Sequence, residues 1–398
     1  MIPKIDSDIG ISVYSTSFNG CGGKIRQNAE DFIVNEILSE KSTSSIKQNE
    51  GYAVYKLKKQ NIDTSHALQD FFKKTGIRLK SLGLKDASAI TEQFVCSMSK
   101  SKAIQNFSAK KYSIEKVGFT KKPLTKKDMI GNHFKIKITE PSSDPSKFDE
   151  FEKILNFYGY QRFGSTRPVT HLIGKAILQR NFSKAVKLLI SFTSEFDSEQ
   201  NIELRKKLSN ESNYKKLLPD VPPQMDLEKI AISEIVKHND PLKAIKALPL
   251  QIRRFFIQAY QSFLFNKTLS ASFENGENLF NPQEGDVCFD KNGVLGKYAK
   301  GLDQKPSIPL VGYSYYKKTR FDYYVSRILE NEEISPKDFY LKEIQEISNE
   351  GGYRHSSIVC SDYSVNNNTI SFSLSRGSFA TIVLREIIKP NDPIRAGF

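Results

Sequence analysis

The sequence lacks any hydrophobic run that approaches the roughly 20 apolar residues needed to cross a membrane as a helix. Its first residues, 1–6, also lack the apolar segment of a signal peptide. The four cysteines, at positions 21, 96, 288 and 360, form no Cys-x-x-Cys motif and no closely spaced set, which argues against a disulfide-stabilised secreted fold. We therefore expect a soluble protein with reduced thiols, located in the cytoplasm.

Metal ligands and cofactor motifs are equally scarce. The five histidines, at positions 66, 133, 171, 238 and 355, are scattered, and no pair has the spacing of a zinc site. The sequence contains no phosphate-binding loop, no dinucleotide-binding glycine motif after a predicted strand and no Gly-x-Ser-x-Gly nucleophile motif. We predict that the protein uses no metal and no cofactor. It is then either an enzyme based on an acidic side chain or not an enzyme.

Positive charge is abundant and locally concentrated. The 398 residues carry a formal net charge of +14, and positions 100–139 hold eleven lysines against only Glu115 and Asp128. Such a block is also typical of a solvated face, and lysines that alternate with Phe134, Ile136 and Ile138 are typical of an edge strand. Because no apolar helical stripe accompanies the lysines, nucleic acid is a better partner than a membrane surface.

The hydrophobic pattern changes twice along the chain. The first 160 residues and the tail look like mixed strands and helices, whereas residues 170–269 look helical. Asp63 and Gly76 bracket one predicted helix as its cap and its stop, and the polar stretch 41–51 is predicted to be a loop. The pattern predicts strands over 31–37, 52–57, 81–84, 94–98, 133–139 and 369–374, and helices over 64–75, 171–178, 183–192, 253–269 and 379–388. The expected fold class is α/β (α+β), a mixed-sheet core interrupted by a more helical insertion.

Two segments have the composition of a functional site. In 82–93, Asp86 follows a short predicted strand and is flanked by small residues, although an aspartate there is also a common turn former. Segment 156–164, Asn-Phe-Tyr-Gly-Tyr-Gln-Arg-Phe-Gly, contains four aromatic residues with two amides and an arginine. Aromatic rings stack on extruded bases, but the same rings are also typical of a core.

These segments belong to a longer series that resembles the TruD family of tRNA pseudouridine synthases over nearly the whole chain. Five pieces occur in the family's order: 28–36, 83–93, 156–164, 259–266 and 377–386. The resemblance implies a pseudouridine-synthase core over 1–165 plus 345–398, and a family-specific insertion domain over 166–344. It also implies an isomerase that converts uridine to pseudouridine in tRNA, at position 13, with tRNA as the partner and no cofactor, membrane or protein partner.

The resemblance also implies roles for individual residues. Asp86 matches the catalytic aspartate, which either attacks C1′ of the ribose or deprotonates the sugar, and Arg26 matches a basic residue near it. Asn156 matches an active-site asparagine. The order Asn-Phe-Tyr-Gly leaves open whether Tyr158 or Phe157 stacks on the target base.

Further residues are expected to line the pocket or to bind RNA. Phe379 and Arg385 come from the C-terminal motif and are expected to line or brace the pocket, although Arg385 fits a structural ion pair equally well. The candidates for phosphate contacts are Lys110, Lys111, Lys121, Lys122, Arg253 and Arg254.

Two other functions compete with the isomerase hypothesis. One is an RNA-binding protein or RNA chaperone that keeps the fold without turnover, and the intact Gly83-Leu84-Lys85-Asp86 segment argues against it. The other is a glycosidase that releases the base and leaves an abasic RNA.

Overall fold

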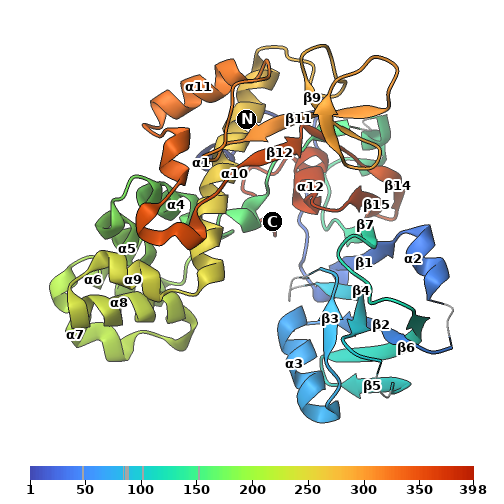
Figure 1. Cartoon of the computed structure of the whole chain (residues 1–398), viewed down its shortest axis with the longest axis horizontal. Coiled ribbons are helices and arrows are strands. Elements are labelled where there is room, and N and C mark those ends of the chain that lie inside the picture. Colours follow the sequence, from blue (N-terminus) through green and yellow to red (C-terminus); the bar gives the residue numbers. More distant parts are fainter. Residues whose placement is uncertain (47–48, 84, 86–88, 101–102, 151–152) are drawn as a thin grey trace. The chain divides into compact units, whose positions relative to one another are not determined.

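The computed structural model describes residues 1–398 except 47–48, 84, 86–88, 101–102 and 151–152 (Figure 1). The chain packs as two compact units, which we describe separately. The helical unit consists of 1–15 and 155–357, and the sheet unit consists of 16–154 and 358–398. The chain therefore passes from one unit to the other after residues 15, 154 and 357. The boundaries predicted for the catalytic core and the insertion are not tested by this division and stay a prediction.

The sheet unit is built on one mixed β-sheet, which has nine strands in the described part of the chain. Strands β1 and β4 run parallel, whereas the other strand pairs recorded in this sheet are antiparallel. The sheet order is β14 (Ser361–Asn366), β15 (Thr369–Ser375), β7 (Met129–Lys137), β1 (Phe32–Leu38), β4 (Ile90–Ser97), β2 (Tyr52–Lys59), β6 (Tyr112–Thr120) and β5 (Asn106–Ala109), with β3 (Leu79–Ser81) also paired to β4. This architecture confirms the predicted α/β class.

Strand β7 corrects one expectation from the sequence. The lysine-containing strand near 133–139 was expected at an edge, but β7 lies inside the sheet, between β1 and β15. Lys135 and Lys137 are exposed because they alternate with the buried Phe134 and Ile136, so that only one face of the strand meets solvent. The alternation of lysines with apolar residues therefore indicates a strand with one buried face and does not indicate a strand at the edge of the sheet.

Helix α3 (Thr64–Thr75) matches its predicted bounds. The Asp63 side chain accepts a hydrogen bond from the amide of His66 at 3.0 Å, and Gly76 ends the helix with a φ of 72°. Ala67 and Phe71 are buried against residues of β2, β4 and β6, so that α3 covers one face of this part of the sheet (Figure 1). The other helices of this unit are α2 (Glu40–Ser45), α12 (Ala380–Ile388) and the 3-10 turns η1 (Ala29–Asp31) and η2 (Pro145–Glu150).

Helix α2 was not expected, because residues 41–51 were predicted to be a loop. The hydroxyl of Ser39 accepts a hydrogen bond from the amide of Ser42 and so caps the helix. The hydroxyl of Ser42 in turn donates to Asp128 at 2.7 Å. The prediction fails for 41–45 because polar, Ser-rich composition conceals a capped helix that is held by a distant partner.

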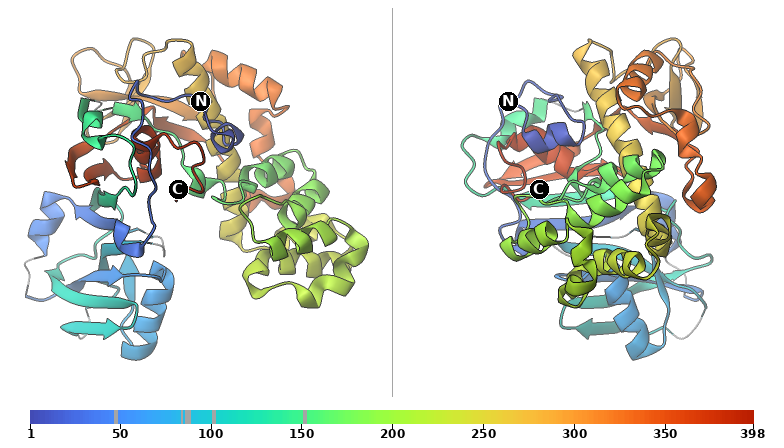
Figure 2. Two further views of the ribbon diagram at one scale, coloured as in Figure 1. Left: turned by 180° about the vertical axis from the view of Figure 1, so that it is seen from behind. Right: turned by 90° about the vertical axis from the view of Figure 1, so that its left-hand side faces the viewer.

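The helical unit is arranged around the long helix α10 (Leu250–Glu274). Helices α4 (Thr170–Leu178) and α11 (Asp322–Asn331) pack along it, together with strand β11 (Gln304–Leu310) (Figure 2). Helix α4 can approach α10 closely because Gly174 has no side chain. A Cβ added at Gly174 would lie 2.1 Å from the carbonyl oxygen of Phe256, which is too close. The remaining helices are α1 (Lys4–Asp8), α5 (Phe182–Ser191), α6 (Glu199–Lys207), α7 (Tyr214–Leu217), α8 (Asp226–His238) and α9 (Pro241–Ala247).

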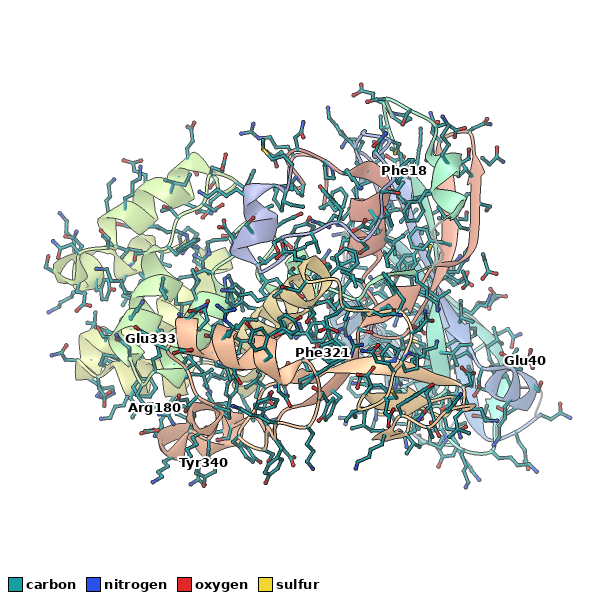
Figure 3. All side chains as sticks on the ribbon, turned by 90° about the horizontal axis from the view of Figure 1, so that it is seen from above. Phe18, Glu40, Arg180, Phe321, Glu333 and Tyr340 are labelled. Atoms are coloured by element: carbon teal, nitrogen blue, oxygen red, sulfur yellow. The ribbon has the colours of Figure 1, made fainter. Side chains whose placement is uncertain are left out.

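Shorter elements complete this unit. The four-stranded sheet has the order β10 (Leu295–Lys297), β9 (Val287–Asp290), β11 and β12 (Gly352–His355). A separate two-stranded sheet, in which β8 (Lys153–Leu155) pairs with β13 (Ser357–Val359), includes the points after residues 154 and 357 where the chain passes from one unit to the other. The 3-10 turns are η3 (Tyr160–Arg162), η4 (Glu211–Asn213), η5 (Leu218–Asp220), η6 (Pro223–Met225), η7 (Pro336–Phe339) and η8 (Lys342–Ile347). The Arg180 guanidinium ties the end of α4 to η7, because it donates to the carbonyl oxygens of Asp338 and Tyr340 at 2.8 and 2.7 Å (Figure 3).

One carboxylate links three helices of the helical unit. Glu332, at the end of α11, forms ion pairs with Lys175 of α4 at 2.7 Å and with Lys267 of α10 at 2.8 Å. Burial by itself would raise the pKa of the Glu332 carboxyl, but the hydrogen bonds and positive charges of the two lysines outweigh burial and hold the pKa below its ordinary value. The ionised form is therefore the one that the fold stabilises.

We expect Glu332→Gln to lower the free energy of unfolding by about 1–3 kcal/mol at pH 7, because two partly buried lysines lose their counter-charge. The pKa is lower in the folded than in the unfolded state, so this contribution is complete above the unfolded pKa and is lost as the pH falls through the folded one. Urea unfolding of both proteins from pH 7 to pH 4 measures the difference. The control is Glu203→Gln, which removes an exposed pair with Lys207. An equal loss in both variants would contradict the prediction.

Candidate active site

A buried ion pair holds Lys85, the residue that directly precedes Asp86 in the sequence. Asp86 itself lies outside the described residues, but its neighbour Lys85 is described. The Lys85 ammonium lies 2.7 Å from Oε1 of Glu36 on β1, and the two side chains are only 8% and 0% exposed. The other carboxylate oxygen of Glu36 accepts a hydrogen bond from the amide of Phe94 on β4, at 2.9 Å. Glu36 therefore fixes the residue next to Asp86 against two strands.

A chain of hydrogen bonds holds the backbone at Gly83 and Lys85. The amide of Lys85 donates to the hydroxyl of Thr64, the first residue of α3, at 3.1 Å. That hydroxyl donates to Oε1 of Gln93 at 2.8 Å, and Nε2 of Gln93 donates to the carbonyl oxygen of Gly83 at 2.9 Å. Thr64 and Gln93 are buried, so these bonds are shielded from water. Glu36 and Gln93, which the sequence supplied only as motif residues, thus anchor Lys85 and Gly83.

Arg26 lies in the sheet unit, in a left-handed conformation with a φ of 57°. Its guanidinium lies 4.2 Å from the ring centroid of Phe32 and donates to the carbonyl oxygen of Gly397 at 3.4 Å. The turn that follows is closed by Asp31, whose carboxylate accepts a hydrogen bond from the amide of Asn28 at 2.7 Å. The conformation of Arg26 is thus set by its surroundings, and its proximity to Asp86 stays a prediction.

Two residues of the C-terminal motif were predicted to belong to the site. Phe379 directly precedes α12, and Arg385 lies within it. Phe379 is the half-buried residue that precedes the helix, whereas the Arg385 side chain is completely buried and forms an ion pair with Glu386 at 3.2 Å. Glu386 also accepts hydrogen bonds from the amide and the hydroxyl of Thr16, both at 3.1 Å. This is the geometry of a structural ion pair, one of the two roles that the sequence left open for Arg385. The pocket-lining role of both residues stays a prediction.

In the helical unit the structure places Asn156, Phe157 and Tyr158 in a buried, hydrogen-bonded segment. Asn156 is 4% exposed and its amide nitrogen donates to the carbonyl oxygen of His355 at 3.0 Å. Phe157 is 0% exposed and Tyr158 is 8% exposed. The side chain of Asn266, on α10, accepts a hydrogen bond from the amide of Tyr158 at 2.9 Å and donates to its carbonyl oxygen at 3.2 Å. Asn266, from the motif at 259–266, therefore holds the backbone of Tyr158, which belongs to the motif at 156–164.

Arg354, on β12, contacts this segment but was not identified from the sequence. Its guanidinium lies 4.1 Å from the ring centroid of Tyr158 and donates to Oδ1 of Asn156 at 2.6 Å. Arg162 lies 5.3 Å from the same ring. Arg162 belongs to a recognised motif, but Arg354 is 198 positions from Asn156 and stands in no motif, so that only the fold reveals it.

The predicted phosphate-binding residues fall into two groups. Lys110, Lys111, Lys121 and Lys122 are exposed at and near the ends of β5 and β6, where their charges face solvent. Arg253 instead pairs with Glu346 at 2.5 Å, and Arg254 donates to the Glu346 carbonyl oxygen at 3.0 Å. Arg253 already has a carboxylate partner and so gains less from a phosphate, whereas the exposed Arg254 and the four lysines stay candidates.

The described residues offer little to a metal or to a membrane. Among them, no group of three or more His, Cys, Asp or Glu side chains is arranged to hold a metal ion. Within the same residues, no helix combines the length and the apolar character that crossing a bilayer requires.

Comparison with known proteins defines the class and then the family. A relative from Pyrobaculum islandicum, named a probable tRNA pseudouridine synthase D, is 31% identical over 100% of this chain and 99% of its own length. A relative of the same name from Methanosarcina acetivorans is 30% identical over 99% of this chain and 98% of its own length. The crystal structure of a TruD protein from Methanosarcina mazei superimposes with a TM-score of 0.79 at 27% identity, covering 99% of both chains.

These relatives place the chain among the pseudouridine synthases, which are isomerases. The family model for tRNA pseudouridine synthase D (TruD) matches residues 8–387, and the chain belongs to this family. The resemblance found in the sequence, its fold class and its enzyme class are thereby confirmed.

We expect Thr64→Val to loosen the backbone at Gly83 and Lys85, because valine keeps the shape but removes the hydroxyl that accepts from Lys85 and donates to Gln93. Native-state hydrogen exchange should show faster exchange of the Lys85 amide, by about tenfold for a loss of about 1.4 kcal/mol. Thr64→Ser, which keeps the hydroxyl, is the matched control and should exchange like the wild type. Equal exchange in Thr64→Val and Thr64→Ser would show that the hydroxyl does not hold the loop.

Proposed function

We propose that this protein isomerises uridine to pseudouridine in tRNA, at position 13, with Asp86 as the catalytic carboxylate and without a cofactor. Family membership over residues 8–387 supports the reaction. The observation that carries the assignment of the site is the buried anchoring of Lys85, the residue directly before Asp86. We further propose that the protein acts in the cytoplasm, in keeping with its four cysteines, all of which are free thiols.

The reaction balances without any added group. The bond from uracil N1 to ribose C1′ breaks, the base turns, C1′ bonds to C5, and the proton of C5 is lost while N1 gains one. Asp86 attacks C1′ or deprotonates the sugar, and either role requires an ionised carboxylate. Either role also requires that the carboxylate meet the sugar at one fixed distance, so a firmly anchored loop suits this chemistry.

The other residues are assigned supporting roles. We assign stacking on the target base to Tyr158, which is 8% exposed, whereas Phe157 is 0% exposed. Asn156 is assigned to the same pocket, Arg26 to the neighbourhood of the catalytic carboxylate, and Phe379 and Arg385 to its lining or bracing. The exposed lysines between 110 and 122 are assigned to tRNA phosphates, whose contacts offset the cost of extruding the uridine, on the order of a few kcal/mol.

We also propose a division of the chain into two domains. Residues 1–165 and 345–398 form the catalytic core of the pseudouridine synthase, and residues 166–344 form the insertion domain of the family. The helical region from α4 to α11 falls inside the assigned insertion.

We expect Asp86→Asn to reduce pseudouridine formation in an unmodified tRNA transcript by about a thousandfold or more, because an amide neither attacks C1′ nor takes up a proton. Binding of the same transcript should change little, since the phosphate contacts are retained. Primer-extension mapping of pseudouridine and filter binding measure the two quantities.

Asp144→Asn is the control for this experiment, because Asp144 is an exposed aspartate of the same unit that bonds only locally, to Ser146. If wild type and Asp86→Asn were equally inactive on every RNA offered, an RNA-binding function would replace the enzyme. Free uracil and an abasic RNA would instead identify a glycosidase. Full turnover by Asp86→Asn would remove Asp86 from the reaction.

We expect Tyr158→Phe to keep kcat/KM within about fivefold of the wild type, because the ring that stacks on the base remains. Tyr158→Leu should lose about ten- to a hundredfold, which corresponds to a stacking contribution of about 1–3 kcal/mol. Steady-state kinetics on the tRNA transcript measure both, and circular dichroism checks that each variant is folded. If Phe157→Leu impaired folded enzyme more than Tyr158→Leu, the stacking role would pass to Phe157.

A further inference from the structure

Two arginines lie against the ring of Tyr158. The guanidinium of Arg354, from β12, lies 4.1 Å from the ring centroid, and that of Arg162, from η3, lies 5.3 Å from it. We call Arg162 and Arg354 the arginine pair. Both residues belong to the helical unit, so this arrangement is complete within one compact part of the chain.

The surroundings hold both side chains in place. Arg354 donates to Oδ1 of Asn156 at 2.6 Å and to its carbonyl oxygen at 3.2 Å, which fixes the plane of the guanidinium. Arg162 lies between Tyr158 and the ring of Phe255, 5.3 Å from each centroid. Because the guanidinium groups are fixed in advance, a ligand that binds them does not have to order them.

The charge of the pair is poorly compensated at Arg162. Its guanidinium donates to the neutral amide oxygen of Gln258 at 3.4 Å, and it forms no ion pair with any residue that the structure describes. Burial lowers the pKa of both guanidinium groups. Tyr158 opposes this effect at both, and repulsion from Arg162 lowers the pKa of Arg354 further. Two like charges held beside each other and partly shielded from water are costly, and an anion placed beside them removes that cost.

We propose that Arg162 and Arg354 bind one phosphodiester of the substrate RNA beside the base that stacks on Tyr158. The proposal rests on the proposed function, which supplies RNA as the ligand. An aromatic ring next to two guanidinium groups matches a nucleotide, whose base takes the ring and whose phosphate oxygens take the N–H donors. A carboxylate of a protein partner would satisfy the charges but would bring no base to the ring of Tyr158.

The first test measures the Kd of a tRNA transcript against KCl concentration for wild type, Arg162→Gln and Arg162→Lys. Each phosphate contact contributes about 0.7–0.9 to the slope of log Kd against log salt concentration. We expect Arg162→Gln to bind about tenfold more weakly at low salt and to lose about this much slope. Arg162→Lys should keep the slope, because it keeps the charge.

The matched control is Arg327→Gln. Arg327 lies 5.4 Å over the ring of Tyr323 in the same unit but is exposed, so it reproduces the arginine–tyrosine contact without the burial. We expect its slope to equal that of the wild type. An unchanged slope and Kd in Arg162→Gln would overturn the proposal, and so would equal losses in Arg162→Gln and Arg327→Gln.

A second test leaves the protein intact and neutralises the RNA. Wild-type protein is given transcripts in which one methylphosphonate replaces a single phosphodiester next to the target uridine. One of these linkages should weaken binding about tenfold in the wild type and hardly at all in Arg162→Gln, since both changes remove the same contact. Equal binding of every neutral linkage by the wild type, or losses that multiply in the variant, would overturn the proposal.

Both tests measure binding, so they are separate from the test of turnover. If wild-type protein binds tRNA but forms no pseudouridine, the proposed function fails, while the salt slope still decides the phosphate subsite. If pseudouridine forms normally and the slope does not depend on Arg162, the subsite fails and the function stands.

Discussion

The position of Lys85, the residue directly before Asp86 in the sequence, depends on one carboxylate that has no contact with water. Both oxygens of Glu36 are occupied, one by the ammonium of Lys85 and the other by the amide of Phe94. A buried ion pair is stable only when its remaining hydrogen-bonding capacity is also satisfied, and this arrangement meets that condition. Because Glu36 and Phe94 belong to β1 and β4, Lys85 takes its position from the one pair of strands that runs parallel in the described part of this sheet.

The same device recurs in the helical unit, where the irregular segment at Asn156 and Tyr158 is held by side chains instead of by a sheet. Asn266 satisfies both backbone groups of Tyr158, and Arg354 satisfies the side chain and the carbonyl oxygen of Asn156. Irregular backbone that is buried must find such partners, because each unpaired group costs free energy. Asn266, a motif residue on α10, is thus explained by the backbone groups that it holds.

The sequence predicts the local features well and the distant ones poorly. Asp63 and Gly76 define α3 correctly because capping is decided within a few residues. The place of β7 inside the sheet is not predictable from its own residues, because it depends on β15, which begins more than 230 positions later. Helix α2 was missed because the Ser42 hydroxyl finds its partner at Asp128. Arg354 stands in no motif, so that nothing near it in the sequence marks it. The residues of the five motifs were identified from the sequence, but the hydrogen bonds that they form were not predictable.

The repeated passage of the chain between the units has a consequence for biosynthesis. When a ribosome has completed β7, the strand has its neighbour β1 but not β15, which is translated only after the whole 155–357 segment of the helical unit. Until then, the edge of β7 at Phe134 and Ile136 has open backbone donors and acceptors, which are prone to pairing with other chains. The lysines that alternate with these two residues keep such an edge charged while the nascent polypeptide waits for its last strand.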